Sequence, residues 1–303
     1  MLNFLPSFLL GLISALLYAA NTVCVFAVMA PVILIKLIIP HAGVRLLLTR
    51  FLMFLGTVWV DVNSFILWLT QKIKWDVSGI EGLNIDDSYL VISNHRSWTD
   101  ILVLQHLFNH RIPFLKFFLK KELFWVPVLG VAWWALDFPY MKRYSRQFIE
   151  KHPELRGKDM ETTRKYCEKF KNSPVSVINF LEGTRFSYTK HDKQKSSFSH
   201  LLLPKAGGVA IVLSSMGEYL SKIVNVTIVY PENKPPVDFW HFLRGDIHFI
   251  TVRVSVLPIP KEFIGKNYEE DNDVREEFKK WVNQLWQEKD QLIEEILVEH
   301  GVP

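Results

Sequence analysis

The feature that most limits the fold of this chain is an uncharged, apolar run over residues 4–35. A straight helix over these residues would reach roughly 48 Å at about 1.5 Å per residue, well beyond a hydrocarbon core of about 30 Å. The length therefore predicts a tilted membrane span with an extension or a re-entrant hairpin, with Pro31 as the expected break. A signal peptide fits poorly, because a basic segment before the run is missing and the run is too long.

The charges around this run set the expected orientation in a membrane. The first basic residues, Lys36, Arg45 and Arg50, all follow the run. Because basic residues stay preferentially on the cytoplasmic side, we expect everything after the run to lie there. The sequence therefore predicts a protein of the cytoplasmic (inner) membrane whose main domain faces the cytoplasm. The formal net charge of +4 fits an anionic surface or an acidic substrate and identifies neither.

A second apolar segment, residues 51–69, carries a polar stripe. Thr57, Asp61 and Ser64 are spaced so that they fall on one face of a helix. An unpaired carboxylate at mid-bilayer is costly, so a helix in the membrane interface, or one that turns this stripe toward protein, is favoured over a second full span. Residues 1–74 are therefore expected to form a membrane-anchoring helical region.

From about Trp75 the composition becomes that of a globular domain, which we expect to cover residues 75–303. Apolar runs typical of buried strands alternate with helix-like patterns, and this alternation predicts an α/β fold. The last pattern has an apolar face and acidic residues near its start, as an amphipathic structural helix does. The strand-like runs are residues 90–93, 175–181, 224–230 and 247–257, and the helix-like patterns are residues 159–171, 207–220 and 273–298.

The first candidate site lies where the strand-like run 90–93 passes into a turn. His95 and Asp100 stand five positions apart in the sequence NHRSWTD at residues 94–100. A histidine that a carboxylate orients is a candidate general base for a hydroxyl nucleophile. The alternative is a turn histidine and a helix-capping aspartate that never meet. If the pair is catalytic, the four intervening residues must fold the chain back by starting a helix, so that Asp100 reaches His95.

The second candidate site has the same layout. Glu182, Gly183, Thr184 and Arg185 follow the strand-like run 175–181. Arginine is suited to bidentate recognition of phosphate, and the N–H groups of a glycine turn can add donors. The alternative is an ordinary turn with a Glu–Arg pair at the surface, which would stabilise the fold only slightly.

Two further segments could bind anions. Arg143 lies between Lys142 and Arg146, a cluster that equally suits a solvated basic face. Gly207 and Gly208 could open a helix toward an anion or simply allow tight packing.

Several other chemistries lack their sequence patterns. The chain has no Gly-x-Ser-x-Gly elbow, no Walker loop, no His-Glu-x-x-His and no dinucleotide fingerprint. Its two cysteines, Cys24 and Cys167, are too few for a metal cluster. Because Cys24 lies in the apolar run, a disulfide is disfavoured and a reducing compartment is expected. Basic residues are not interleaved with aromatic ones as in a nucleic-acid module.

Taken in order, these residues resemble the glycerolipid acyltransferase family of 1-acyl-sn-glycerol-3-phosphate acyltransferases, often called PlsC-like. His95 and Asp100 match its first block, Arg143 the arginine that ends its second, and residues 182–185 its third. Residues 224–231 lie where its fourth, apolar block belongs. The resemblance thus runs from about Trp75 to Pro231.

Finer features of the resemblance concern the branch of the family. Residues 142–146 and 281–290 are similar to bacterial YihG-type probable acyltransferases. The second block lacks the usual glycine and has Asp-Phe-Pro at residues 137–139, so only its arginine is carried over. In the fourth block, Asn225 and Thr227 stand where prolines are common.

The resemblance implies a mixed sheet flanked by helices and an acyltransferase at the membrane surface. His95 would take the proton from the sn-2 hydroxyl of 1-acyl-sn-glycerol-3-phosphate, which attacks the thioester of acyl-CoA or acyl-carrier protein to give phosphatidic acid. Asp100 would orient the imidazole. No metal, no cofactor beyond the acyl donor and no nucleic-acid partner is implied. The acceptor's phosphate would be held by Glu182, Gly183, Thr184, Arg185 and Arg143.

Three alternatives stay open. The same chemistry could act on another lysophospholipid, on glycerol-3-phosphate or on a lyso-lipid without phosphate. The chain could instead be a non-enzymatic, membrane-anchored interaction protein that has kept the fold. A serine hydrolase of thioesters is the third, and the missing nucleophile elbow argues against it.

Overall fold

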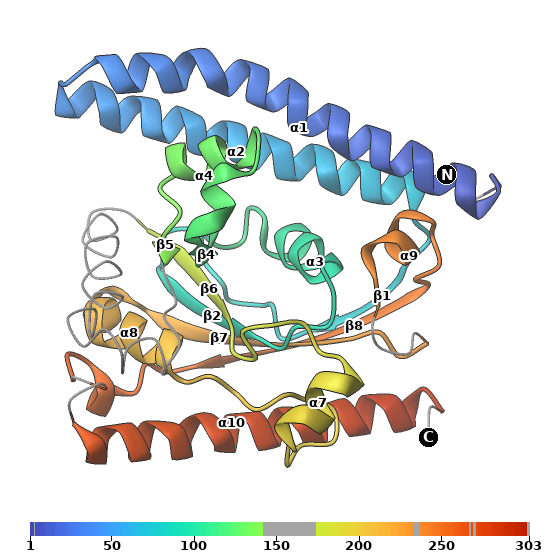
Figure 1. Ribbon diagram of the computed structural model, residues 1–303, viewed down its shortest axis with the longest axis vertical. Coiled ribbons are helices and arrows are strands. Elements are labelled where there is room, and N and C mark those ends of the chain that lie inside the picture. Colours follow the sequence, from blue (N-terminus) through green and yellow to red (C-terminus); the bar gives the residue numbers. More distant parts are fainter. Residues whose placement is uncertain (3, 142–173, 233–236, 267, 269–270, 302–303) are drawn as a thin grey trace.

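The computed structural model describes residues 1–2, 4–141, 174–232, 237–266, 268 and 271–301. Arg143 and the helix expected over residues 159–171 lie outside these. The described elements form a mixed sheet with helices on both faces and two long helices along one side (Figure 1). The expected α/β class, with an apolar helical region at the N-terminal end, is confirmed.

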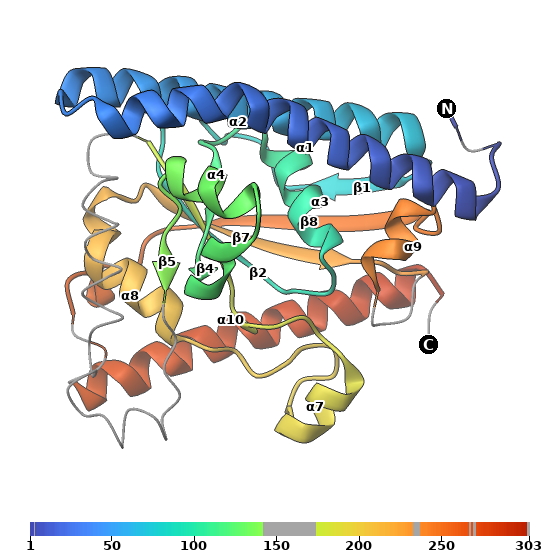
Figure 2. The same ribbon diagram turned by 45° about the horizontal axis from the view of Figure 1, so that its top comes forward.

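The two long helices, α1 (Ser7–Ile38) and α2 (Ala42–Thr70), form a hairpin. The amine of Met1 donates to the carbonyl of Leu69 at 2.9 Å, so the two outer ends of the hairpin meet. By length and composition, both helices are able to cross a membrane. They lie along the domain rather than standing away from it, with α3 and α4 beneath them (Figures 1 and 2).

The expected break at Pro31 is wrong, because α1 continues through this residue. Proline removes a single helical hydrogen bond, the one its nitrogen would donate to the carbonyl four residues earlier. Packing on both sides of Pro31 offsets that loss. Met29 and Ile33 are buried against Leu52 and Leu55 of α2.

The polar stripe of α2 meets protein at Asp61, as one of the two expected arrangements requires. Its carboxylate accepts a hydrogen bond from the side-chain amide of Asn109 at 2.7 Å and lies 2.8 Å from Nε2 of His110. Both partners follow α3 (Thr99–Phe108). The helix starts nine residues before the expected apolar segment and therefore includes Arg45 and Arg50.

The main sheet has the strand order β1-β8-β7-β2-β6-β3. All neighbouring strands are parallel except β7 and β8, which are antiparallel, so the sheet is mixed as expected. A two-stranded sheet, β4 (Leu119–Lys120) with β5 (Tyr140–Met141), lies beside it. The six strands are β1 (Lys74–Ser78), β2 (Tyr89–Ser93), β3 (Leu115–Phe117), β6 (Ser176–Phe180), β7 (Lys222–Val229) and β8 (Phe249–Leu257).

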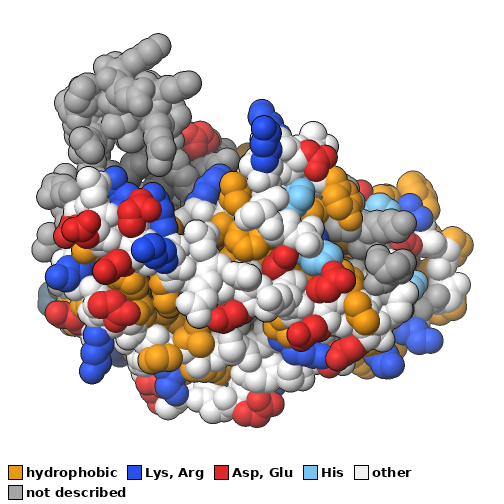
Figure 3. Space-filling view, turned by 90° about the horizontal axis from the view of Figure 1, so that it is seen from below, with side chains coloured by type: hydrophobic (Ala, Val, Ile, Leu, Met, Phe, Trp, Pro, Cys, Tyr) orange, Lys and Arg blue, Asp and Glu red, His pale blue; other side chains and the backbone are white. Residues whose placement is uncertain are grey.

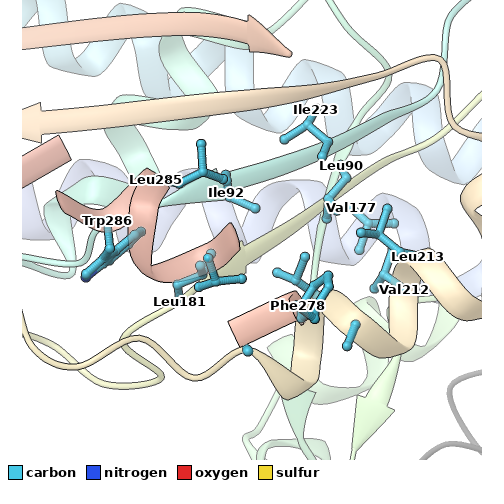
Figure 4. Packing of buried hydrophobic residues seen from close by; sticks show 14 of the residues in the cluster. Leu90, Ile92, Val177, Leu181, Val212, Leu213, Ile223, Phe278, Leu285 and Trp286 are labelled. Carbon is cyan, nitrogen blue, oxygen red and sulfur yellow. The ribbon is translucent and has the colours of Figure 1, made fainter. Parts of the chain in front are cut away.

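Helices cover the two faces of the sheet in different ways. Between the sheet and the hairpin lie α3, α4 (Leu129–Ala135) and α9 (Phe239–Leu243), while α8 (Gly207–Met216) and α10 (Asn272–Glu299) lie on the opposite face (Figures 1 and 2). The amphipathic C-terminal helix is thus confirmed. Its buried side chains pack with the sheet and α8 in one apolar core, which includes Leu90, Val177, Val212, Phe278 and Trp286 (Figure 4).

Short helical segments complete the chain. The polar stretch after the second motif, rich in Lys, Ser and His, begins inside a helix, α7 (Tyr188–Gln194). The Ser187 side chain caps it by accepting a hydrogen bond from the Lys190 N–H, a local interaction that favours helix starts. The described residues also include short 3₁₀ helices, η1 (Lys121–Trp125), η3 (Gly217–Tyr219) and η4 (Lys261–Phe263).

Candidate active site

Neighbouring parallel strands bring the two sequence motifs together. Strands β2 and β6 pair in parallel with Ser93 opposite Phe180, and β2 pairs on its other side with β7. Because the carboxyl ends of parallel strands lie at one edge of a sheet, the turns that follow them meet there. The turn after β2 carries His95, and the turn after β6 carries Glu182 through Arg185.

The expected contact between His95 and Asp100 is confirmed. His95 Nδ1 lies 2.8 Å from Asp100 Oδ2. The same oxygen accepts the backbone N–H groups of Arg96 at 2.6 Å and Ser97 at 2.9 Å. Helix α3 begins at Thr99, so the start of a helix folds the chain back onto the histidine. The alternative, in which the two side chains never meet, is therefore wrong: Asp100 lies within the first turn of α3, and its carboxylate bonds back to His95 and to N–H groups that precede the helix.

This geometry selects one form of the imidazole. Asp100 is fully buried, and its oxygens accept N–H and O–H donors, so the Nδ1 of His95 carries the proton that it shares with Oδ2. Nε2 then keeps a free electron pair, which is what a general base needs.

The backbone and the ring of His95 are held on several sides. Its ring stacks on Phe180, with centroids 3.9 Å apart and planes 13° apart. Its carbonyl accepts the N–H of Phe186 at 2.7 Å. The side chain of Asn94 pairs with both backbone groups of Ile228 on β7, at 2.8 and 2.9 Å. A base held this rigidly needs little reorganisation before proton transfer.

The structure corrects the expected role of Glu182. Its carboxylate is fully buried and accepts the N–H of His95 at 2.7 Å and the N–H of Leu202 at 3.1 Å. Burial raises the pKa of Glu182 to about 7. A side chain closed in this way holds the turns together and does not reach a phosphate in the pocket.

The other residues of the second motif face the site. Gly183, Thr184 and Arg185 line the same pocket as His95. The guanidinium of Arg185 lies 5.1 Å from the centre of the Trp98 ring, a cation–π contact that directs the charge toward the pocket. Lys190 braces this turn, because its ammonium donates to the Thr184 hydroxyl at 2.9 Å and the Arg185 carbonyl at 2.7 Å.

The pocket next to His95 is large and mainly apolar. Its volume is about 560 Å³, within the usual range for small-molecule sites. One wall comes from the hairpin and another from α4, so the pocket runs between the sheet edge and the long helices. Its apolar lining includes Val25, Phe26, Met29, Trp59, Phe114, Leu129, Ala132, Trp133, Leu136 and Phe138.

Several residues of the site could not be read from the motifs. Tyr230, in the fourth block, donates its hydroxyl to Asp100 Oδ1 at 2.6 Å. Lys289 of α10 is buried beneath the site on β7, and burial lowers its pKa to about 7. Both lie far from His95 in sequence, and the chemical type of each residue was the only signal. Within the described residues, no three His, Cys, Asp or Glu side chains converge as a metal site would require.

Comparison with known proteins independently supports the family resemblance that the sequence motifs indicate. The family model described as Acyltransferase matches residues 74–230. The chain is 28% identical over 220 residues to human 1-acyl-sn-glycerol-3-phosphate acyltransferase delta, covering 69% of this chain and 53% of that protein. It is 24% identical over 222 residues to the mouse epsilon enzyme, covering 68% and 57%. The chain thus spans about half the length of the curated relatives it matches.

A solved structure is similar in fold. It is the 1-acyl-sn-glycerophosphate acyltransferase PlsC from Thermotoga maritima, with a TM-score of 0.52 and 18% sequence identity. The match covers 92% of this chain and 95% of that one, so it extends well beyond the residues that the family model matches.

Proposed function

This chain belongs to the acyltransferase family, and we propose that it transfers a fatty acyl chain from a thioester to the sn-2 hydroxyl of 1-acyl-sn-glycerol-3-phosphate, giving phosphatidic acid. One observation carries the proposal. A histidine with its Nδ1 held by a buried aspartate lines a large apolar pocket that Arg185 also lines. This arrangement suits an acceptor with a hydroxyl, a phosphate and an acyl chain.

The reaction follows from these positions. Nε2 of His95 accepts the proton of the acceptor's hydroxyl while that oxygen attacks the thioester carbonyl carbon. The tetrahedral intermediate collapses, the carbon–sulfur bond breaks, and the departing thiolate takes the proton back from the imidazolium. Asp100 keeps the tautomer in place and stabilises the imidazolium between the two proton transfers. The substrate's hydroxyl takes the part that serine plays in a hydrolase, so no acyl-enzyme forms.

The second motif supplies the candidate phosphate site. Arg185 offers a planar set of donors, and Trp98 holds its guanidinium near the pocket. Gly183 has a φ of 65°, a left-handed conformation that glycine adopts without strain, and it makes the turn in which Thr184 and Arg185 are presented. Arg143 stays a prediction as a further phosphate ligand.

The hairpin suits attachment to a lipid bilayer. Its outward face exposes large apolar side chains that water would disfavour, and α1 and α2 also contribute a wall of the pocket. On the opposite side of the molecule, acidic and basic side chains are interspersed, as on a surface that faces water (Figure 3). We therefore place the hairpin in the membrane surface, where it draws lipid into the pocket. The most exposed residues include Phe8, Leu16, Val23, Leu34, Leu47, Phe54, Phe65 and Trp68.

The donor and the location follow from the same scheme. Either acyl-CoA or acyl-carrier protein can present a thioester at His95, and both are cytoplasmic carriers. The basic residues Lys36, Arg45 and Arg50 lie near the turn of the hairpin and favour the cytoplasmic side of the inner membrane.

The proposal is tested by product analysis. Purified protein in mixed micelles is incubated with isotope-labelled acyl-CoA or acyl-carrier protein and a panel of acceptors, and products are identified by mass spectrometry. The panel contains 1-acyl-sn-glycerol-3-phosphate, glycerol-3-phosphate, a lysophosphatidylcholine and a monoacylglycerol. We expect labelled phosphatidic acid as the main product. Preferential acylation of another acceptor would replace the proposed substrate, and absence of transfer to all four would overturn the proposed activity.

A further inference from the structure

Tyr230 stands directly after β7, at the sheet edge that carries the candidate site. Its hydroxyl donates to Oδ1 of Asp100 at 2.6 Å, across 130 positions of sequence. Both side chains are buried: Tyr230 is 4% exposed and Asp100 0%. A short hydrogen bond between a buried phenol and a buried carboxylate is a strong interaction.

The two oxygens of Asp100 have separate sets of partners. Oδ2 accepts the His95 ring and the backbone N–H groups of Arg96 and Ser97, all from the same turn. Oδ1 faces away from this turn, and Tyr230 is the donor that the structure records for it within the described residues. The local turn therefore satisfies half of the carboxylate, and a distant strand end satisfies the other half.

We propose that Tyr230 is a positioning residue for the catalytic pair, acting on His95 through Asp100. This inference rests on the proposed function, because it assumes that His95 is the base. The phenol fixes the plane of the carboxylate, so that Oδ2 stays in line with Nδ1. It also withdraws negative charge from Asp100, which weakens the attraction of the carboxylate for a positively charged ring.

The charged groups around this pair are few. Arg96 and Glu182 act electrostatically on Asp100 or on its partners, and Arg96 also faces Tyr230. The Arg96 guanidinium lies over the Phe186 ring at 4.6 Å, on the side of the turn. Burial and the neighbouring Asp100 raise the pKa of Tyr230, so the phenol remains a donor throughout the working range of an acyltransferase assay.

The test compares Tyr230→Phe with Tyr89→Phe. Tyr89 is equally buried, and its hydroxyl bonds to Asn84 and Asp87, away from the site, so it controls for the loss of any buried phenol. We expect Tyr230→Phe to lower kcat about 10-fold, as loss of a hydrogen bond to a charged group does. The acidic limb of the kcat/KM profile should move upward by about 0.5 pH unit, because a less solvated carboxylate favours the imidazolium. Tyr89→Phe should change neither quantity.

Two further measurements separate positioning from simple folding. In an Asp100→Asn background, Tyr230→Phe should add no further loss of kcat, because its effect passes through the carboxylate. Replacing Tyr230 with 3-fluorotyrosine keeps the fold and strengthens the donor, so the acidic limb should move downward. The proposed role of Tyr230 would be overturned if Tyr230→Phe lowered kcat equally with and without Asp100. It would also be overturned if the acidic limb of the kcat/KM profile moved in neither the Phe nor the 3-fluorotyrosine variant.

The outcomes also separate this inference from the proposed function. A wild-type protein without acyl transfer, or a fully active His95→Ala variant, overturns the proposed function and this inference with it. If the wild type is active and its activity depends on His95, but Tyr230→Phe changes neither kcat nor the pH profile, only the inference about Tyr230 is overturned.

Discussion

Lys289 should make the stability of this protein depend on pH in a way that one substitution removes. Its side chain is 2% exposed, and its ammonium donates to the Val226 carbonyl at 2.5 Å and the Thr227 hydroxyl at 2.9 Å. Burial lowers the pKa of Lys289 from 10.5 to about 7, because the charged form loses its hydration. In the unfolded chain the pKa of Lys289 returns to its ordinary value of 10.5.

The direction in which stability changes with pH follows from the number of protons bound in the folded and in the unfolded state. Between about pH 7 and 10.5 the unfolded state holds a proton on Lys289 that the folded state lacks, so the free energy of unfolding rises with pH. One group contributes about 1.4 kcal/mol per pH unit in such a window. From pH 7.5 to 9.5 this is about 3 kcal/mol, or roughly 6–12 °C in melting temperature for a domain of this size.

The assay compares Lys289→Met with Lys280→Met, which lies on the exposed side of the same helix. Melting temperatures are followed by tryptophan fluorescence in detergent from pH 7.5 to 9.5, above the pKa of about 7 of Glu182. We expect the melting temperature of the wild type to rise relative to that of Lys289→Met as pH rises, while Lys280→Met follows the wild type. Parallel curves of melting temperature against pH for wild type and Lys289→Met would show that Lys289 keeps its ordinary pKa in the folded protein.

Three further predictions concern the site and its walls. Glu182→Gln should lower kcat by about 10-fold at pH 8 and less at pH 6, where the pKa of about 7 leaves the wild-type side chain largely neutral; equal loss at both values would contradict this. Gly130→Ala places a Cβ 2.0 Å from the Phe124 carbonyl oxygen and should cost about 1–3 kcal/mol in unfolding experiments, whereas Gly207→Ala, in open space, should be tolerated. Arg185→Ala should raise KM for the phosphorylated acceptor more than it lowers kcat; an unchanged KM would place the phosphate elsewhere.

Much of the fold was predictable because four of its strands lie in mainly apolar runs. The four expected strand-like runs correspond to β2, β6, β7 and β8. Strand β3, Leu115–Phe117, has only three residues, so its own sequence carries almost no periodicity and it is ordered by pairing with β6. Strand β1, Lys74–Ser78, is short and half-exposed, and it belongs to the sheet through β8.

The site was predictable only where its parts are close in sequence. His95 and Asp100 are five positions apart, so a single helix start brings them together. The contacts of Glu182 with His95 and of Tyr230 with Asp100 span 87 and 130 positions, and they depend on the strand order of the sheet. Lys289 is an intermediate case. It lies on the same helical face as Val282, Trp286 and Ile293, but lysine is seldom buried, so its burial follows only from the packing of α10 on β7.

The central claim is that His95 is the base of an acyl transfer to a lipid hydroxyl. The most direct test measures kcat for labelled acyl-CoA and 1-acyl-sn-glycerol-3-phosphate with wild type, His95→Ala and His248→Ala, an exposed histidine that serves as control. We expect kcat to fall about 10²–10⁴-fold or more for His95→Ala, as for loss of a general base, and to stay unchanged for the control. A folded His95→Ala protein with near wild-type turnover would contradict this claim.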